Sequence, residues 1–235
     1  MAFDSDFGSE LEKEDNQGGK PPYQKNYNNN NGNKWNNNGG GNGGFNKFKK
    51  KPEEPFDPET FTLYRPYYMT GNKDTPDGII DTMKRLAKEL ESFNYTLRLG
   101  GLVGPDTLLS EAAKKTELYL PWKDFDNKVS KNYFNTPQSL EVAKRFHPSF
   151  DTLKPVIHAF LAMNARIVLG SKLDSPVRFV ICWSEDGAET GKEKTSRTGN
   201  VGHVIAIASN MLIPVFNLGK PDAEQRFKSY LSLND

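Results

Sequence analysis

The chain has 235 residues and a formal net charge of +1, so its length suits one sizeable domain and its bulk charge does not mark a nucleic-acid binder. Its hydrophobic content of 35% is low for a fully globular protein. The single cysteine, Cys182, excludes a disulfide framework, and no apolar run approaches the ~18 residues of a membrane span, so we expect a soluble cytoplasmic protein without a membrane partner.

Residues 1–55 hold most of the hydrophobic deficit and are expected to form a disordered tail. The first fifteen residues are acidic, whereas residues 17–51 contain no acid and seven lysines. Between Asn26 and Asn46 lie eleven asparagines and six glycines. Such a composition cannot bury enough apolar surface to offset its ordering entropy, which is typical of disorder.

The tail also carries aromatic side chains among its lysines. In a flexible segment, aromatic rings can stack on unpaired bases while lysines meet phosphates. The residues expected to contact nucleic acid in this way are Lys34, Trp35, Phe45, Lys47, Phe48, Lys49, Lys50 and Lys51. A solubilising linker and a self-associating segment are the alternative interpretations, and the role of the acidic segment stays open.

The remainder, residues 56–235, is expected to fold as one domain that begins with a strand and a helix. Aromatic residues at 61–69 predict the first strand, and Thr75 followed by Pro76 predicts a helix with Thr75 as its N-cap. A second strand at 95–99 leads into a glycine turn, after which Asp106 is expected to cap a short helix.

The rest of the domain continues this alternation. The expected elements are a strand at 117–122, a helix after Thr136, a helix at 155–169, a strand at 177–183, a helix at 201–210 and a last strand at 213–218. Alternating strands and helices predict an α/β fold, here a Rossmann-like parallel sheet flanked by helices, with the Asn/Gly-rich tail outside it.

Open α/β sheets bind ligands beyond the carboxyl ends of their strands. Two glycine-rich turns stand there, each directly before a predicted helix, where backbone N–H groups and the helix dipole favour phosphate. The residues expected to contact a phosphate or nucleotide are Gly71, Asn72, Gly100, Gly101, Gly104, Asp106, Thr198, Gly199, Asn200, Gly202 and His203. For His203, donation to a phosphate and a helix-capping role are both open.

Other polar and aromatic side chains have two interpretations each. Lys192, Lys194 and Arg197 predict a cationic lid over the pocket mouth, although such charges are most often solvated. Trp122 and Trp183 end predicted strands and either stack on a base or plug the rim. The three histidines match no metal-ligand spacing, so no metal is expected, and His158 is expected to be structural.

The motifs in order resemble the SLOG superfamily, which includes the DNA-processing protein A (DprA) and Lonely Guy families. The resemblance rests on the run 97–107, on residues 118–123, on the strand and loop 179–187, and on residues 198–202 and 213–218. The glycine turn is similar to the phosphate loop of the DprA-like branch, and the later runs are similar to small bacteriophage members. Arg166 resembles a helical arginine of those members, which implies that it reaches the site; the alternative is a surface ion pair.

The same resemblance bears on catalysis. Lonely Guy enzymes are phosphoribohydrolases with a motif that resembles Pro-Gly-Gly-x-Gly-Thr-x-x-Glu, in which the glutamate serves catalysis. The matching segment here, 198–206, has no preceding proline and no carboxylate at the expected position. Glu185, Asp186 and Glu189 lie upstream in a polar loop, where carboxylates are most often merely solvated. We therefore expect no catalytic residues and no cofactor.

The first hypothesis is a non-enzymatic protein that binds single-stranded DNA in phage replication, recombination or transcription. The alternative is a sensor or sequestering protein for a nucleotide or nucleotide-derived signal, and the third is a nucleoside-monophosphate phosphoribohydrolase. The expected partner is single-stranded nucleic acid or a nucleotide. A homo-oligomer and a polymerase or other replication partner are further hypotheses.

Overall fold

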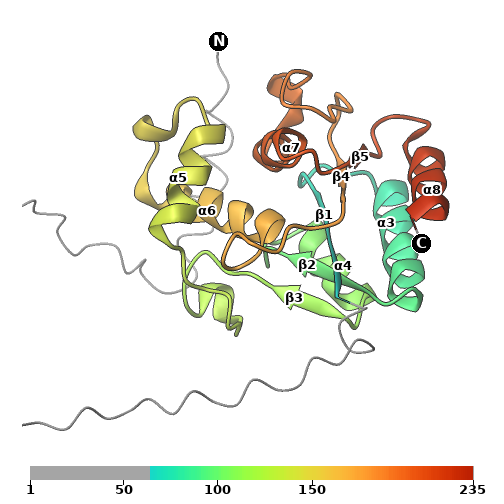
Figure 1. Ribbon diagram of the computed structural model, residues 1–235, viewed down its shortest axis with the longest axis horizontal. Coiled ribbons are helices and arrows are strands. Elements are labelled where there is room, and N and C mark those ends of the chain that lie inside the picture. The colour runs from blue at the N-terminus through green and yellow to red at the C-terminus, as the bar shows by residue number, and fades with distance from the viewer. Residues whose placement is uncertain (1–63, 235) are drawn as a thin grey trace, which may run out of the picture.

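The computed structural model describes residues 64–234, so the interpretation of residues 1–55 as a tail lies outside the described residues. Five strands form one parallel sheet in the order β3-β2-β1-β4-β5 (Figure 1). The strands are β1 Arg65–Gly71, β2 Tyr95–Leu99, β3 Thr116–Leu118, β4 Val180–Trp183 and β5 Val215–Asn217. The order reverses between β1 and β4, and this switch point is where open α/β sheets bind ligands.

Within residues 64–234, six α-helices flank the sheet and confirm the Rossmann-like α/β prediction. They are α3 Asp77–Ser92, α4 Pro105–Ala112, α5 Pro137–Phe146, α6 Pro155–Leu169, α7 Val201–Asn210 and α8 Ala223–Asn234. Successive side chains of β1 point to opposite faces, so Tyr67 and Met69 pack with α3, α4 and α8, whereas Tyr68 packs with α5, α6 and α7. Burial on both faces explains why the central strand β4, Val-Ile-Cys-Trp, is a continuous apolar run.

Three elements match their predicted ranges residue for residue: β2, α6 and α7. The predicted strand at 117–122 ends at Leu118 instead, because Tyr119 pairs with Asn132 in an isolated bridge outside the sheet. The predicted strand at 177–183 begins only at Val180, since the Val177 amide donates to Val168 O of α6 before the chain joins the sheet. The predicted strand at 213–218 shrinks to residues 215–217.

Two predicted helix caps are wrong. The Thr75 hydroxyl donates to Asn72 O at 2.6 Å and closes the turn after β1, while α3 begins at Asp77 without a side-chain cap. Asp106 lies inside the first turn of α4, and its carboxylate reaches back to the turn before the helix instead of capping it. The helix predicted after Thr136 is confirmed as α5, and the Thr136 hydroxyl caps it by accepting from the Ser139 amide at 3.1 Å.

Helix α8 was not predicted, although its apolar spacing was visible in the sequence. Ala223 and Phe227 are buried against the sheet, and Phe227 lies 4.9 Å from Phe179 between ring centroids. The helix closes the α3–α4 face at the β5 edge (Figure 1). Among residues 64–234, no helix combines the length and the apolar character that crossing a bilayer requires.

Candidate nucleotide or nucleic-acid site

A pocket of about 300 Å³ opens at the switch point, beyond the carboxyl ends of β1 and β4. Three segments line most of it: residues 72–74 after β1, His147 and Pro148 after α5, and residues 194–200 before α7. Glu185, Leu161, Gly202 and His203 complete the wall. The pocket therefore lies where the topology predicts a ligand site, with polar groups converging on it from loops that the chain separates widely.

The turn before α7 supplies the part of the wall best suited to an anion. Thr198, Gly199, Asn200 and Gly202 all line the pocket, and their contact with a phosphate stays a prediction. The positive end of the α7 dipole lies at this turn. Two of its backbone N–H groups are engaged within the protein, Gly202 with Gly199 O at 3.0 Å and Val201 with Asn72 Oδ1 at 3.4 Å. An anion bound here would therefore gain mainly from the helix dipole.

Asn72 ties this turn to the loop after β1. Its side-chain amide donates to Thr198 O at 3.0 Å, and its Oδ1 accepts from the Val201 amide at 3.4 Å. Gly199 has φ of +61° and approaches so closely that a Cβ there would lie 2.7 Å from Asn72 Nδ2. A glycine is thus required at this position, and Asn72 acts mainly by holding the turn in place.

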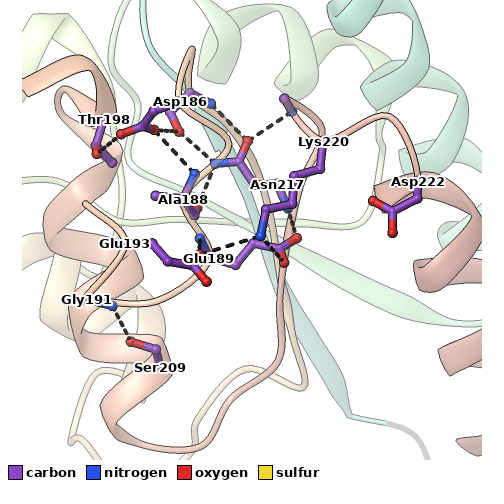
Figure 2. Close-up of polar contacts among 12 residues, drawn as sticks. Asp186, Ala188, Glu189, Gly191, Glu193, Thr198, Ser209, Asn217, Lys220 and Asp222 are labelled. Carbon is purple, nitrogen blue, oxygen red and sulfur yellow. Dashed lines mark hydrogen bonds and ion pairs between the residues drawn. The ribbon is translucent and has the colours of Figure 1, made fainter. Parts of the chain in front are cut away.

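Asp186 fixes the polar loop that carries the rest of the wall (Figure 2). Its carboxylate accepts hydrogen bonds from the hydroxyls of Thr198 at 2.5 Å, Thr195 at 2.6 Å and Ser184 at 2.8 Å. Partial burial raises the pKa of Asp186, but these hydrogen bonds outweigh it and lower the pKa to about 2. The carboxylate is thus a structural anion of the loop, and not a solvated acid or base.

The side chain of Asn217, the last residue of β5, anchors the same loop to the sheet. Asn217 is fully buried; its Nδ2 donates to Ser184 Oγ at 2.6 Å and to Ala188 O at 2.7 Å (Figure 2). The Glu189 carboxylate accepts from the backbone N–H of Asn217 at 2.9 Å and from the Lys220 ammonium at 3.1 Å. With Asp186 and Glu189 both engaged, Glu185 is the upstream carboxylate that remains at the pocket.

The charges on the pocket wall have an excess of cations. Lys73, Lys194 and Arg197 line it together with Asp74 and Glu185. Arg197 lies 3.5 Å from Glu185, and both side chains are 63% exposed, so this ion pair is weak and open to competition from an anionic ligand. Of the predicted cationic lid, Lys194 and Arg197 reach the pocket and Lys192 does not.

His203 lies in the wall but is not arranged as a phosphate donor. Its Nε2 faces the carbonyl oxygen of Ala143 at 3.2 Å, and a carbonyl can only accept, so Nε2 carries the proton. The pKa of His203 is lowered to about 3, mainly by burial. The hydrogen bond to Ala143 raises this pKa, whereas the nearby His147 and Lys194 lower it further. The ring is therefore neutral, and its buried Nδ1 is an acceptor, which repels an oxyanion.

The first glycine turn, 100–106, does not line the pocket, although Pro105 packs beside Gly71. Asp106 is buried, and its carboxylate accepts from the Gly100 amide at 2.9 Å. Burial raises the pKa of Asp106 to about 6, against hydrogen bonds from the Gly100 and Leu102 amides that lower it. The two glycine turns, expected to form two halves of one site, are thus separate: Gly100, Gly101, Gly104 and Asp106 form a self-contained loop.

Arg166 is not at the pocket either. It is 1% exposed, and its guanidinium donates to Asn135 Oδ1 at 2.9 Å, Asn132 O at 3.1 Å and Leu120 O at 2.8 Å. These bonds satisfy the loop that follows β3. Both proposed roles, reaching the ligand and forming a surface ion pair, are replaced by a buried structural one.

The two tryptophans are also structural. Trp122 is 5% exposed and packs edge-on against Phe125 and Phe160, with centroids 5.0 and 5.4 Å away. Trp183 is partly buried against the α3–α8 side. Neither tryptophan lines the pocket, so each packs against a core cluster and neither interpretation describes it. His158 stacks on Phe150 at 4.0 Å, which confirms its structural role.

Three wall residues carried no site signal in the sequence: His147, Pro148 and Leu161 come to the pocket because α5 and α6 return over the switch point. Lys73 and Asp74 line the wall from the loop after β1, beside the predicted site residue Asn72. The segment 194–200 could be found because glycines before a helix mark it. Among residues 64–234, no three His, Cys, Asp or Glu side chains gather closely enough to hold a metal ion.

The fold and the switch-point pocket define a doubly wound α/β protein with a ligand-sized cavity. No protein-family model and no curated protein matches the chain. Among solved structures, DNA processing protein A from Helicobacter pylori, described with a unique single-stranded DNA binding mode, is similar over 68% of each chain, with 16% identity and a TM-score of 0.40. Likeness of this degree bears at most on the fold, so function has to follow from the chain's own residues.

Proposed function

We propose that this protein binds single-stranded DNA without catalysing a reaction, and that the switch-point pocket holds one nucleotide of the strand. The observation that carries the proposal is the convergence of the α7 N-terminus with Lys73, Lys194 and Arg197 on one pocket. Helix N-termini and cations are the groups that recognise phosphate. Because of the resemblance to small phage members of the SLOG superfamily, we extend the proposal to a role in phage replication, recombination or transcription.

Catalysis is not part of the proposal, because the carboxylates that remain on the pocket wall, Asp74 and Glu185, do not stand at the helix position that the phosphoribohydrolase motif requires. Asp186 and Glu189 hold the loop, and the first turn of α7 carries no acidic residue. A phosphoribohydrolase needs a carboxylate placed against the ribose. Incubation with AMP should therefore release no free adenine.

Fluorescence anisotropy of a labelled single-stranded oligonucleotide tests DNA binding directly. We expect binding at low salt, with a slope of log affinity against log salt near −2 if about three phosphates are neutralised. The double variant Lys194→Ala/Arg197→Ala should make the slope shallower by about 1.4. Lys192→Ala is the matched control, because Lys192 is an exposed lysine of the same loop that does not line the pocket.

Absence of binding by the unaltered protein at low salt would falsify this proposal. An equal loss in Lys192→Ala and in the double variant would show general charge attraction instead of a site. Unchanged binding by the double variant would move the interface away from the pocket.

A free nucleotide is the second candidate, and the pocket's size favours it. A volume of about 300 Å³ lies at the small end of the range for small-molecule sites and suits a single nucleotide. Thermal shift with mononucleotides separates the two candidates, because a ligand at 100 times its Kd adds about 2.7 kcal/mol of stability. A mononucleotide that binds as tightly as an oligonucleotide would favour the sensor.

A further inference from the structure

Two aromatic side chains on the loop after β3 are exposed without a role in the core. Tyr133 is 37% exposed and Phe134 is 67% exposed, and Val129 on the same loop is 86% exposed. The other aromatic residues of this region, Trp122 and Phe125, are each 5% exposed. Exposed apolar side chains that are grouped mark contact surfaces, whereas single scattered ones are normal.

The loop holds this aromatic pair in a fixed position. On one side, Asn132 pairs with Tyr119, and Ser130 donates its hydroxyl to Leu118 O. On the other side, the buried Asn135 amide donates to Pro121 O at 2.9 Å and Ala159 O at 3.0 Å. Because both flanks are anchored, a partner that stacks on the rings pays little entropy to order the backbone that carries them.

The charges beside the rings suit a polyanion. Lys123, Lys128 and Lys131 stand on this loop against Asp124 and Asp126. Lys128 forms an ion pair with Asp126 and also donates to Gly101 O at 2.9 Å, so these two charges largely cancel. Lys123 and Lys131 are exposed, and Asp124 is the one other acid on this loop to offset their charge. Exposed rings with nearby lysines are the combination that binds unpaired bases and their phosphates.

The loop and the pocket both lie on the side of the sheet where the strands have their carboxyl ends. All strands are parallel, so the loop after β3 and the loops after β1 and β4 leave from carboxyl ends on one side. Helix α5 connects them, beginning three residues after Phe134 and ending next to His147 in the pocket wall (Figure 1). A helix of 10 residues is about 15 Å long, a span of a few nucleotides.

We propose that Tyr133 and Phe134 form a base-stacking surface for the strand whose phosphate lies in the switch-point pocket. The strand would run along α5, whose last turn carries Lys144 and Arg145. This inference rests on the proposed function and adds a second contact region to it. The pocket binds phosphate, and the aromatic pair binds bases with little preference among them, because every base offers a ring face.

The test compares Phe134→Ala and Tyr133→Ala/Phe134→Ala with Phe93→Ala in anisotropy measurements on a labelled oligothymidylate. Phe93 is the matched control: it is 51% exposed and lies between α3 and β2, on the side of the sheet where the strands have their amino ends. Phe134→Ala should weaken oligonucleotide binding about tenfold, the double variant should weaken it further, and Phe93→Ala should change nothing. Phe134→Tyr, which keeps a ring, should retain most of the affinity.

The outcomes separate this inference from the proposed function. If the unaltered protein binds the oligonucleotide and Phe134→Ala binds as tightly, the stacking surface is refuted while the pocket proposal survives. If the unaltered protein does not bind, both fail. If the double variant converts a dimer to a monomer in sedimentation and leaves DNA affinity unchanged, a second copy of the chain covers the rings, and the inference is overturned.

Discussion

The two glycine turns of this protein look alike in sequence and behave differently in the fold. The turn after β2 is closed by its own acid, because the buried Asp106 carboxylate accepts from the Gly100 amide. The acid that bonds the turn before α7 is Asp186, twelve residues before Thr198 in the polar loop, and its carboxylate accepts from the Thr198 hydroxyl. The turn itself lines the pocket. A turn that binds its own carboxylate has already filled the place of an external anion.

This difference teaches what a glycine-rich turn needs in order to be a ligand site. Glycine permits close approach of a ligand to the backbone in both turns. Only the turn before α7 also lines the pocket, with Lys73, Lys194 and Arg197 on the same wall. In the glycine turn after β2, the acid is Asp106, which the sequence suggested as a site residue. Its bond to the Gly100 amide is the reason that this turn is self-contained.

The largest expected effect comes from adding a side chain at the pocket turn. Gly199→Ala should lower the free energy of unfolding by about 3 kcal/mol, because its backbone conformation, with φ of +61°, strains any L residue and a Cβ would collide with Asn72. Gly104→Ala, with φ of +107° and nothing within 4 Å of the added Cβ, should cost only about 1–2 kcal/mol. Urea unfolding of both variants measures the contrast, and equal losses would refute the role given to Asn72.

A smaller effect is expected from the acid of the polar loop. Asp186→Asn should lower the free energy of unfolding by about 1–2 kcal/mol near neutral pH, after allowing for solvent screening of a partly exposed group. The pKa of Asp186 is depressed to about 2 in the folded protein, so its contribution is present above the unfolded value near 4 and is lost as the pH falls through about 2. Unfolding titrations at stepped pH test this, and a pH-independent difference between the variants would contradict it.

The acid of the first turn should act in the opposite direction. The pKa of Asp106 is raised to about 6, so the folded state holds its proton more tightly than the unfolded state, and stability falls as pH rises from about 4 to 6. Asp106→Asn keeps an oxygen for the Gly100 amide and removes the buried charge. It should raise the free energy of unfolding by about 1 kcal/mol at pH 8 and leave it almost unchanged below pH 4. Destabilisation at pH 8 would show that the ionised carboxylate is needed to hold the turn.

The smallest effect should separate the turns by ligand binding alone. Gly104→Ala leaves the switch-point pocket intact, so oligonucleotide affinity should stay within about twofold of the unaltered protein, which is within ~0.4 kcal/mol. Asn72→Ala releases the pocket turn and should weaken binding clearly more. Anisotropy of the folded variants checks both, and a matching loss in Gly104→Ala would return the first turn to the site.

Much of the fold follows from local pattern. Helix α6 and strand β2 were predicted to the residue because each has a clear period and clear punctuation, as with Pro155 at the start of α6. Thr-Pro predicted a helix start at both Thr75 and Thr136, and a helix follows each of them. The predicted Thr75 cap was wrong, because the Thr75 hydroxyl donates to Asn72 O in the turn after β1.

The sequence by itself determined the alternating elements, the parallel sheet and the glycine turn before α7, because these depend on periodicity and on backbone freedom within a few residues. The tertiary structure decided which turn opens to a pocket, and it put His147, Leu161 and Lys73 on the wall. It also turned Arg166 and Asp106 from candidate ligands into buried structural groups. Burial and hydrogen-bond partners depend on segments distant in the chain, and so does the work a polar side chain does.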